Sequence, residues 1–320
     1  MRKAALLGVH QLARADDRVV FIGSDITKQN LEAFAEEFPE RFFMEGIYEA
    51  HIIGMAAGMA LAGKIPYINT IATFLTRRCY EQIVIDLGLH DLPVRLLGSG
   101  GGVVYAPLGP THLATDDIAI MRTIPNMTVV APCDADEMER LLPATLDWPH
   151  PIYIRIAKGG DRIVSSDEHE FAIGRAITLR DGGDVLLVST GITTQVALEA
   201  ADELAADGIA ASVLHVHTVK PLDAERIVEA AARTRAVVTI EEHVLAGGLG
   251  SAVAEALVDA GAAGVPLARL GFPDVFLDEL GSQAQIMAHH GLTAANVASR
   301  ARALLDSAAD SPKESSWARS

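Results

Sequence analysis

Short apolar runs rich in β-branched residues alternate with longer segments of helical character along most of the chain, and this alternation most restricts the fold. The runs Val19–Gly23 and Ile152–Ile156 predict the first and last strands of one unit, which an amphipathic helix over Lys3–Ala15 precedes. Strands and helices that alternate at this length predict a parallel sheet covered by helices on both faces. A second series starts at Val185 and ends with a helix over Ala294–Asp306. The sequence therefore predicts an α/β protein of two doubly wound domains with parallel or mixed sheets.

The same patterns predict further elements between these limits. Further helices are expected over Asn30–Phe38, Phe74–Leu87, Asp116–Thr123, Asp134–Leu146 with Asp134 as its N-cap, Thr193–Asp207, Asp223–Arg233 and Gly250–Asp259. Further strands are expected over Ile65–Thr70, Val94–Leu97, Thr128–Ala131, Val185–Ser189, Ala211–His215 and Ala236–Glu241.

The segment over residues 158–184 differs from both series because it is charged, contains glycine and lacks a long apolar period. It is predicted to be a linker with a small hairpin-like excursion. We expect a first domain over residues 1–165, a linker over 166–183, a second domain over 184–308 and a disordered polar tail over 309–320.

Composition excludes several classes of protein. A net charge of −16 without a Lys/Arg block argues against a nucleic-acid-binding surface. The two cysteines, Cys79 and Cys133, form neither a disulfide framework nor a metal-ligand spacing, which fits a reducing cytoplasm. Residues 1–16 contain no apolar signal-peptide core, and the longest apolar runs are too short to span a membrane. We therefore expect a cytoplasmic protein that binds neither nucleic acid nor membrane.

The stretch Phe42–Gly63 combines a short apolar run, a turn at Gly46 and a helix of small residues. Gly54, Gly58 and Ala62 recur every four residues and so share one helical face, which allows a second backbone to approach closely. This pattern predicts packing against another helix or against a second copy of the chain.

One carboxylate, Glu49, stands at the start of this helix, where it enters apolar surroundings. A carboxylate in such a place must be paired, protonated or functional. A structural carboxylate at a helix N-terminus is the commoner case, so the residue alone leaves both interpretations open.

Several other segments are candidates for chemistry. The glycines of Gly98–Gly102 lack the spacing of a nucleotide phosphate loop, and the turn Gly247–Gly250 is either an anion site or a tight strand-to-helix turn. His112 follows the turn Gly109-Pro110 at the end of a strand, where ligands of parallel sheets bind. Arg155 ends a buried strand and needs an anionic partner from the protein or a ligand.

Five short motifs, in this order, resemble the C-terminal half of a transketolase over about residues 3 to 308. They are Gly46-Ile47-Tyr48-Glu49, Ala72-Thr73-Phe74-Leu75, Gly109-Pro110-Thr111-His112, Ile124-Pro125-Asn126-Met127, and Glu241-Glu242-His243 with Gly247-Gly248-Leu249-Gly250. The resemblance implies that the first domain binds the pyrimidine of thiamine diphosphate. It implies that the second is the transketolase C-terminal domain, which is usually not catalytic.

The resemblance also implies roles for individual residues. Glu49 matches the glutamate that holds a proton on the far ring nitrogen of the aminopyrimidine, a role that suits a carboxyl whose two protonation states are close in energy. Phe74 matches an aromatic that stacks on the pyrimidine, and His112 matches a histidine that faces the substrate. The expected set is Glu49 and His112 as catalytic residues, Glu49, Phe74, Arg77 and Tyr80 for the cofactor, and His112, Arg155 and Asp25 for the substrate.

Half of the expected cofactor site is absent from the sequence. Thiamine enzymes hold magnesium and the diphosphate with a Gly-Asp-Gly motif, and none occurs in this chain. The resemblance therefore implies a split transketolase, in which a separate chain supplies the diphosphate-binding domain and the Mg2+ ligands. Two copies of each chain are the expected assembly, with Gly54, Gly58 and Ala62 near the central contact.

Departures from the family pattern put the usual pentose phosphate substrates in doubt. Leu108 stands where ordinary transketolases have an acidic residue that binds a sugar hydroxyl, and Gly100 replaces an expected histidine. We expect two-carbon ketol transfer from a ketose or ketose phosphate to an aldose with a non-standard donor or acceptor. The alternatives are a deoxyxylulose-phosphate-synthase-like enzyme, which has an arginine where Arg77 falls, a beta-type subunit of a 2-oxo acid dehydrogenase, and a non-catalytic partner subunit, against which Glu49 argues.

Overall fold

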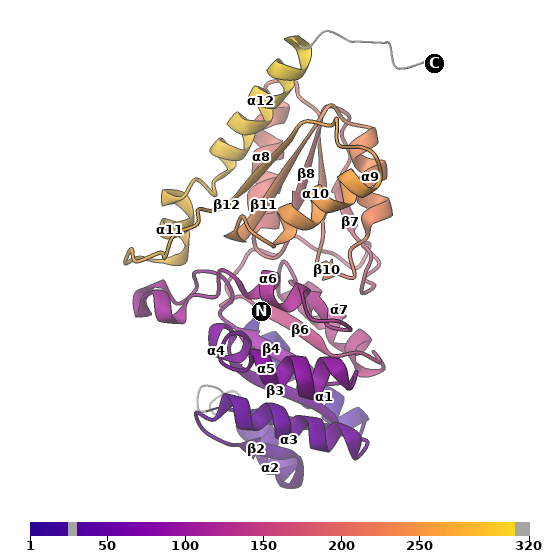
Figure 1. Ribbon diagram of the computed structural model, residues 1–320, viewed down its shortest axis with the longest axis vertical. Coiled ribbons are helices and arrows are strands. Elements are labelled where there is room, and N and C mark those ends of the chain that lie inside the picture. Colours follow the sequence, from indigo (N-terminus) through magenta and orange to yellow (C-terminus); the bar gives the residue numbers. More distant parts are fainter. Residues whose placement is uncertain (25–30, 311–320) are drawn as a thin grey trace.

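A computed structural model describes residues 1–24 and 31–310, with side chains to residue 307. Figure 1 shows two α/β units, one above the other, with the second half of the chain (orange to yellow) above the first (indigo to magenta). Each unit has a β-sheet between layers of helices, so the predicted fold class, two α/β domains with parallel or mixed sheets, is confirmed. Within the described residues, no helix has the length and apolarity that a membrane crossing requires.

The first sheet, within the described residues, has seven strands in the order β10-β5-β6-β4-β3-β1-β2. All neighbours are parallel except β10 and β5, which are antiparallel. The strands are β1 (Val19–Gly23), β2 (Phe42–Met44), β3 (Ile65–Ile71), β4 (Arg95–Ser99), β5 (Thr128–Val130), β6 (Ile152–Ile156) and β10 (Thr218–Lys220).

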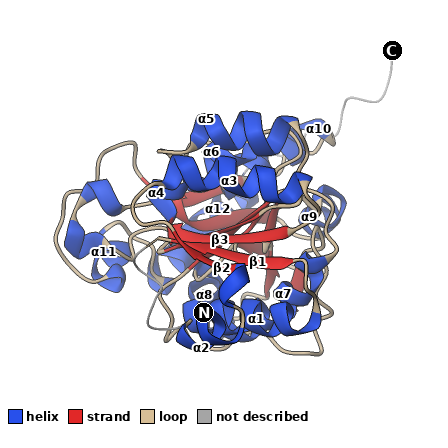
Figure 2. Ribbon diagram, turned by 90° about the horizontal axis from the view of Figure 1, so that it is seen from below, coloured by secondary structure: helices blue, strands red, loops and turns tan. Residues whose placement is uncertain are grey.

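Helices cover both faces of this sheet. They are α1 (Arg2–Ala15), α2 (Glu32–Glu37), α3 (Glu49–Leu61), α4 (Ala72–Thr76), α5 (Tyr80–Gln82), α6 (Asp117–Arg122) and α7 (Ala135–Leu146), with a π-helical segment (Ile83–Leu89) and short 3-10 turns over Pro39–Arg41, Ala106–Leu108 and Pro110–His112. Figure 2 shows α3 and α5 on one face and α1, α2 and α7 on the other.

Successive residues of each buried strand supply the two cores of this domain. Ile22, Ile68 and Leu96 pack with the α3 side, whereas their neighbours Phe21 and Tyr67 pack with α1, α2 and α7. This follows from the two-residue period of a strand, which turns consecutive side chains to opposite faces. Because both faces are covered, the strands are continuous apolar runs rather than alternating ones.

The second sheet has five strands in the order β12-β11-β8-β9-β7, and only the edge strand β7 is antiparallel to its neighbour. The strands are β7 (Ile177–Arg180), β8 (Val185–Ser189), β9 (Ala211–His215), β11 (Ala236–Val244) and β12 (Leu267–Phe272). The helices are α8 (Thr193–Ala206), α9 (Ala224–Ala232), α10 (Leu249–Asp259), α11 (Gln283–His289) and α12 (Ala294–Asp310).

The predicted elements are largely present, and the N-cap at Asp134 is confirmed because its side chain accepts from the Glu137 N–H at 2.8 Å. The prediction of one continuous helix over Phe74–Leu87 was wrong. The chain forms α4, turns through Arg77 and Arg78, and continues as α5 and the π-helical segment. In the turn, Arg77 pairs with Asp116 and Arg78 pairs with Glu49, and no local helical pattern contains these tertiary contacts.

Five of the described helices and strands were not predicted: β2, β7, β10, β12 and α11. Strand β7 falls inside the segment expected to be a linker and pairs with β9. Strand β10 follows β9 in sequence but pairs with β5 of the first sheet, so the second half of the chain completes the sheet of the first. Strand β12 alternates apolar with charged or small residues and carried no clear run.

A buried pair of hydrogen-bonded side chains joins the two domains. Nε2 of His215, at the end of β9, lies 2.9 Å from Oε2 of Glu137 on α7, and both side chains are buried. The same carboxylate oxygen accepts from the Cys133 N–H at 2.6 Å. His217, two residues on, is also buried and stacks on Phe171 with ring centroids 4.4 Å apart.

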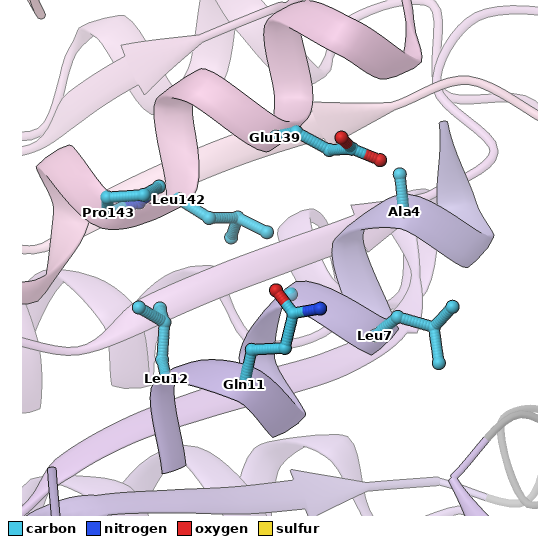
Figure 3. Close-up of a pocket in the computed structure, with 8 residues that line it drawn as sticks. Ala4, Leu7, Gln11, Leu12, Glu139, Leu142 and Pro143 are labelled. Carbon is cyan, nitrogen blue, oxygen red and sulfur yellow. The ribbon is translucent and has the colours of Figure 1, made fainter. Parts of the chain in front are cut away.

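A groove of about 320 Å³ separates parts of α1 and α7. Figure 3 shows its lining side chains, which are mostly apolar with one carboxylate: Ala4, Leu7, Gly8, Gln11, Leu12, Glu139, Leu142 and Pro143. No residue that the sequence proposed for chemistry lines this groove, so it is not the candidate site.

We predict that the interface makes the fold acid-sensitive through His217. Burial lowers the pKa of His217 from 6.5 to about 4. Because the folded pKa is below the unfolded one, the unfolded state takes up the proton first. This contribution to stability is fully present above about pH 6.5 and is lost as the pH falls toward about 4, by about 3 kcal/mol. Thermal unfolding followed by circular dichroism, at constant ionic strength between about pH 8 and about pH 4, measures this loss.

The matched variants are His217→Gln and, as control, His90→Gln at an exposed position. The His217 variant should lose less stability over this window than the unchanged chain, and the His90 variant should follow the unchanged chain. Equal slopes for all three would contradict the assignment. A separate loss at lower pH is expected from Glu137: burial opposes ionisation, but the charge and hydrogen bond of His215 lower the Glu137 pKa from 4.5 to about 2.

Candidate active site

The candidate site lies at the carboxyl ends of the first sheet's parallel strands. Strand β3 runs directly into α4, β4 runs into the glycine loop that leads to His112, and β2 is followed by the turn at Gly46 and then α3. The carboxyl ends of parallel strands lie at one edge of a sheet, where ligands of open α/β sheets bind. Three segments far apart in sequence therefore contribute side chains to one place.

Glu49 is the first residue of α3, and its side chain is 2% exposed. Oε2 of this carboxylate accepts a hydrogen bond from Nη1 of Arg78 at 2.7 Å. The helix N-terminus adds a favourable field, since its free N–H groups carry partial positive charge. From the sequence, the Glu49 carboxylate could be paired, protonated or functional. In this structure it is paired with Arg78, whose side chain is 44% exposed.

Phe74 contacts both Arg78 of this ion pair and His112. The Arg78 guanidinium carbon lies 4.3 Å from the Phe74 ring centroid, a cation–π arrangement. The His112 and Phe74 rings meet edge to face, with centroids 5.0 Å apart. The structure thus brings together three of the predicted residues, Glu49, Phe74 and His112, and adds Arg78.

Arg77 turns away from Glu49 and ties α4 to the loop of His112. Its Nε lies 3.0 Å from each carboxylate oxygen of Asp116, and its Nη2 donates to the Leu113 carbonyl at 2.7 Å. Tyr80 is also directed elsewhere, since its hydroxyl lies 2.7 Å from Oγ1 of Thr123. These two residues frame the site, and a direct contact with a cofactor stays a prediction for both.

The path of the His112 loop is set by its turn residues. Gly109 has φ of 81°, a conformation that favours glycine, and Pro110 begins the 3-10 turn that carries His112. Oγ1 of Thr111 lies 2.9 Å from Nδ1 of His112. At the base of the loop, Gly102 and Ala114 pair through two backbone hydrogen bonds of 3.0 Å. The histidine is therefore held on a short, closed loop.

Arg155 has its anionic partner inside the protein. Its Nε donates to Oδ2 of Asp117 at 2.8 Å, and its Nη2 donates to the carbonyls of Ala114 and Glu242. Burial disfavours the charge, but Asp117 and Glu242 outweigh it and raise the pKa of Arg155. The sequence allowed an anionic partner from the protein or from a ligand, and in the structure the partner is Asp117 of the protein. These contacts favour a structural role, and we do not include Arg155 in the proposed substrate site.

Asp25, the remaining predicted substrate contact, lies outside the described residues.

Two residues that support the site, Arg78 and Asp117, were not among the candidate residues of the sequence analysis. Arg78 lies inside the predicted helix Phe74–Leu87, and in the structure it lies in the turn between α4 and α5, where it pairs with Glu49. Asp117 is buried and accepts from both Arg155 and the Tyr153 hydroxyl, at 2.8 and 2.6 Å. The adjacent acidic pair at residues 116 and 117 was the available signal, but the sequence does not show which of the two faces inward.

Glu242 of the second domain, which belongs to the motif Glu241-Glu242-His243, reaches the loop that follows β4. Its Oε1 accepts from the Val103 N–H and the Gln283 amide, each at 2.8 Å. Gly102 lets this side chain approach, because a Cβ at that position would collide with the carboxylate. Burial raises the pKa of Glu242. The glutamate thus fixes the second domain against the base of the His112 loop.

The backbone N–H groups of the turn Gly247–Gly250 bind a carboxylate of the same chain, that of Glu241. The N–H groups of Leu249 and Gly250 donate to the two carboxylate oxygens of Glu241 at 2.7 and 2.8 Å. The N-terminus of α10 is therefore capped by a side chain of the preceding strand, and the tight-turn interpretation holds.

A cavity of about 390 Å³ adjoins the His112 loop on the side of the second domain. Its lining includes Arg77, Asp116 and Pro110 from the first domain, and Val275 and Phe276 from the second. Phe276 is 89% exposed. The candidate site is thus open on this side within the isolated chain.

Two groups of side chains among the described residues could hold a metal ion, and neither includes a candidate site residue. The buried group is Cys133, Glu137 and His215, whose potential ligand atoms lie within 4.8 Å of one another, and the other is Glu279, His289 and His290. In the buried group Glu137 and His215 are already hydrogen-bonded to each other. Burial and nearby carboxylates raise the pKa of the Cys133 thiol.

Comparisons with known proteins agree with this geometry. Family models for the transketolase pyrimidine-binding domain and the transketolase C-terminal domain match residues 1–160 and 174–297. A 6-deoxy-6-sulfo-D-fructose transketolase subunit SqwH from Clostridium sp. (strain MSTE9) is 40% identical, covering 90% of this chain and 88% of that protein. A subunit of an apulose-4-phosphate transketolase from Phocaeicola vulgatus is 38% identical, covering 88% of this chain and 90% of that protein.

A 1-deoxy-D-xylulose-5-phosphate synthase from Geobacter sulfurreducens is 42% identical over 92% of this chain, but this chain spans only 46% of that longer protein. Among solved structures, a split gene transketolase described as an inactive beta4 tetramer aligns with a TM-score of 0.87 and 38% identity, covering 95% of this chain and 98% of that one. The matched models, the relatives and the paired carboxylate beside an aromatic lead to one conclusion: the chain belongs to the transketolase family and is a transketolase-type transferase subunit.

Proposed function

We propose that this chain is the pyrimidine-binding subunit of a two-component, thiamine diphosphate-dependent transketolase. The observation that supports this most is the convergence of Glu49, Phe74 and His112 at the strand ends. Thiamine diphosphate, when bound, supplies a nucleophilic carbon that can take a two-carbon ketol unit from a ketose and pass it to an aldose. The alternative within the same cofactor class is a deoxyxylulose-phosphate-synthase-like reaction.

The residues of the site fit the aminopyrimidine of this cofactor. The guanidinium of Arg78 is planar and cationic, and it already stacks on Phe74 while it donates to Glu49. A planar ring that carries a proton on its nitrogen has the same two requirements. Phe74 offers a stacking face, and Oε2 of Glu49 shares the proton. His112 meets Phe74 edge to face, and its imidazole could hold or move a proton at a bound substrate.

The diphosphate half of the site comes from a second chain in this proposal. The sequence contains no Gly-Asp-Gly motif. Neither potential metal group within the described residues includes a residue of the candidate site. The partner therefore supplies the Mg2+ ligands. The relative described as an inactive beta4 tetramer supports this, because a chain of similar length assembled only with itself is inactive there.

The exposed face of α3 supports self-association as well. Gly54 and Gly58 face solvent in the isolated chain, and nothing lies within 4 Å of a Cβ built at Gly58. Apolar side chains flank these glycines, with Tyr48 69% and Leu61 70% exposed. An apolar strip around small residues allows two helices to approach closely, and exposed apolar patches mark interaction sites. We place the contact between two copies here, within a two-plus-two assembly.

The substrate is proposed to be a ketose or ketose phosphate other than the usual pentose phosphates. Leu108 precedes Gly109 on the His112 loop and is 56% exposed. Because its side chain is apolar, it offers no hydrogen bond to a sugar hydroxyl at that place. The relatives named for 6-deoxy-6-sulfo-D-fructose and apulose 4-phosphate also support a non-standard sugar.

We predict that Glu49→Gln abolishes turnover and leaves assembly intact. An amide cannot share a proton as a carboxyl does, so kcat should fall by about 10²- to 10⁴-fold. The assay mixes this chain with a co-expressed diphosphate-binding subunit, thiamine diphosphate and Mg2+. Gel filtration of the same samples should show no change in size.

The matched control is Glu81→Gln, an exposed glutamate in α5 that should retain full activity. Unchanged turnover in the Glu49 variant would favour a non-catalytic partner subunit. Full activity of this chain without any second chain would refute the split arrangement instead.

We predict that Gly58→Leu blocks association between copies while the chain stays folded. Leucine is a better helix former than glycine by roughly 0.5–1 kcal/mol, and the isolated chain has room for it. Sedimentation velocity of the two-chain complex should show the assembly reduced to one copy of each chain.

The control is Gly183→Leu, an exposed glycine in a loop of the second domain with equally open surroundings. It should assemble as the unchanged chain does. An unaltered assembly in the Gly58 variant would place the contact elsewhere.

We predict that xylulose 5-phosphate and ribose 5-phosphate are poor substrates of the two-chain enzyme. Leu108→Asp should raise kcat/KM for xylulose 5-phosphate by about tenfold, since one recovered hydrogen bond contributes about 1–1.5 kcal/mol. Initial-rate measurements with the unchanged chain and this variant check the prediction. Turnover of these sugars at ordinary transketolase rates by the unchanged chain would disprove the inference drawn from Leu108.

A further inference from the structure

Arg78 is the residue whose position the proposed function does not explain. It lies in the turn between α4 and α5, and it is exposed as a residue. An exposed arginine normally extends into water, where its charge is best solvated. Here its guanidinium lies over Phe74 and reaches the buried Glu49. Both contacts involve groups that the sequence assigns to the cofactor.

The two contacts define one position in the site. The guanidinium carbon is 4.3 Å from the centroid of Phe74, and Nη1 is 2.7 Å from Oε2 of Glu49. A planar group that stacks on this ring face and also reaches this carboxylate must lie where the guanidinium lies. The side chain of Arg78 and an aminopyrimidine bound in this way cannot be present together.

The charge balance explains why the arginine stays there in the unloaded chain. Glu49 is 2% exposed, and leaving a buried carboxylate without a partner costs several kcal/mol or forces it to take up a proton. Arg78 removes that cost with a charge-assisted hydrogen bond. Its 44% exposure gives it a route out, because the side chain can rotate into water without disturbing the core.

We infer that Arg78 is a placeholder for the aminopyrimidine: it pairs with Glu49 and covers Phe74 until the cofactor displaces it. This inference rests on the proposed function. Its consequence is a competition within the chain. Only molecules in which Arg78 has moved away can bind, so the apparent dissociation constant is raised by the inverse of their fraction. Arg78 is thus a positioning residue that sets how tightly the site is loaded.

The experiment measures binding of thiamine diphosphate to the two-chain complex with Mg2+, by isothermal titration calorimetry. Arg78→Ala should lower the dissociation constant by about 5- to 10-fold and speed binding in stopped-flow fluorescence. Arg78→Lys keeps the charge but cannot stack as a planar group. The dissociation constant of this variant should therefore lie between those of the unchanged complex and of Arg78→Ala.

Two controls separate displacement from a general effect of charge. Arg41 lies over the Phe38 ring at 3.9 Å, which is the same arrangement away from the site, and Arg41→Ala should leave binding unchanged. Inorganic pyrophosphate with Mg2+ probes the partner's half of the site, and its affinity should be the same in the unchanged complex and in Arg78→Ala.

The outcomes are distinct. Weaker or unchanged binding of thiamine diphosphate by Arg78→Ala would overturn the placeholder and leave the proposed function standing. An equal gain for pyrophosphate would also overturn it, because the gain would not arise at the aminopyrimidine. If no variant and not even the unchanged complex binds thiamine diphosphate, the proposed function fails together with this inference.

Discussion

The ion pair of Glu49 with Arg78 is the interaction on which the rest of the site depends. A carboxylate that is 2% exposed cannot be left alone, so whatever lies beside it must be a cation or a proton donor. The fold creates this demand by starting α3 at Glu49, directly behind the edge of the parallel sheet. It also places the face of Phe74 beside the carboxylate, where a cation or a planar group can lie over the ring.

Arg77, the residue before Arg78, has a structural role. Arg77 joins Asp116 and the Leu113 carbonyl, and so it holds the His112 loop beside α4. Arg155, on β6, has the same kind of role, since Asp117 and Glu242 lie beside its guanidinium. Each of these arginines has its partners within the chain. Arg78 differs because its partner is a carboxylate for which the family predicts a different occupant.

The fold class and the order of most elements could be predicted from the sequence, because buried parallel strands are apolar on both faces and therefore easily recognised. The convergence of Glu49, Phe74 and His112 was accessible only through the family resemblance, since each residue has an ordinary structural explanation by itself. The role of Arg78 could not be predicted, because periodicity favoured one continuous helix over Phe74–Leu87. The break at Arg77 and Arg78 arises from tertiary contacts with Asp116 and Glu49, which no local pattern contains.

Solvent exposure on one side of the site weakens its charge interactions in the isolated chain, and a second chain that covers this side would strengthen them. Glu49 is buried while Arg78 is almost half exposed, so water screens the pair from one side only. The cavity beside Arg77 and Phe276 is open in the isolated chain as well. A second chain that covered this side would exclude water and strengthen every charge interaction beneath it, including the one between Glu49 and a bound ring. A partly open site is therefore what we expect of one chain of a pair. Glu49, Phe74 and His112 already lie together, and the strength of their electrostatic interactions would increase when a second chain covers them.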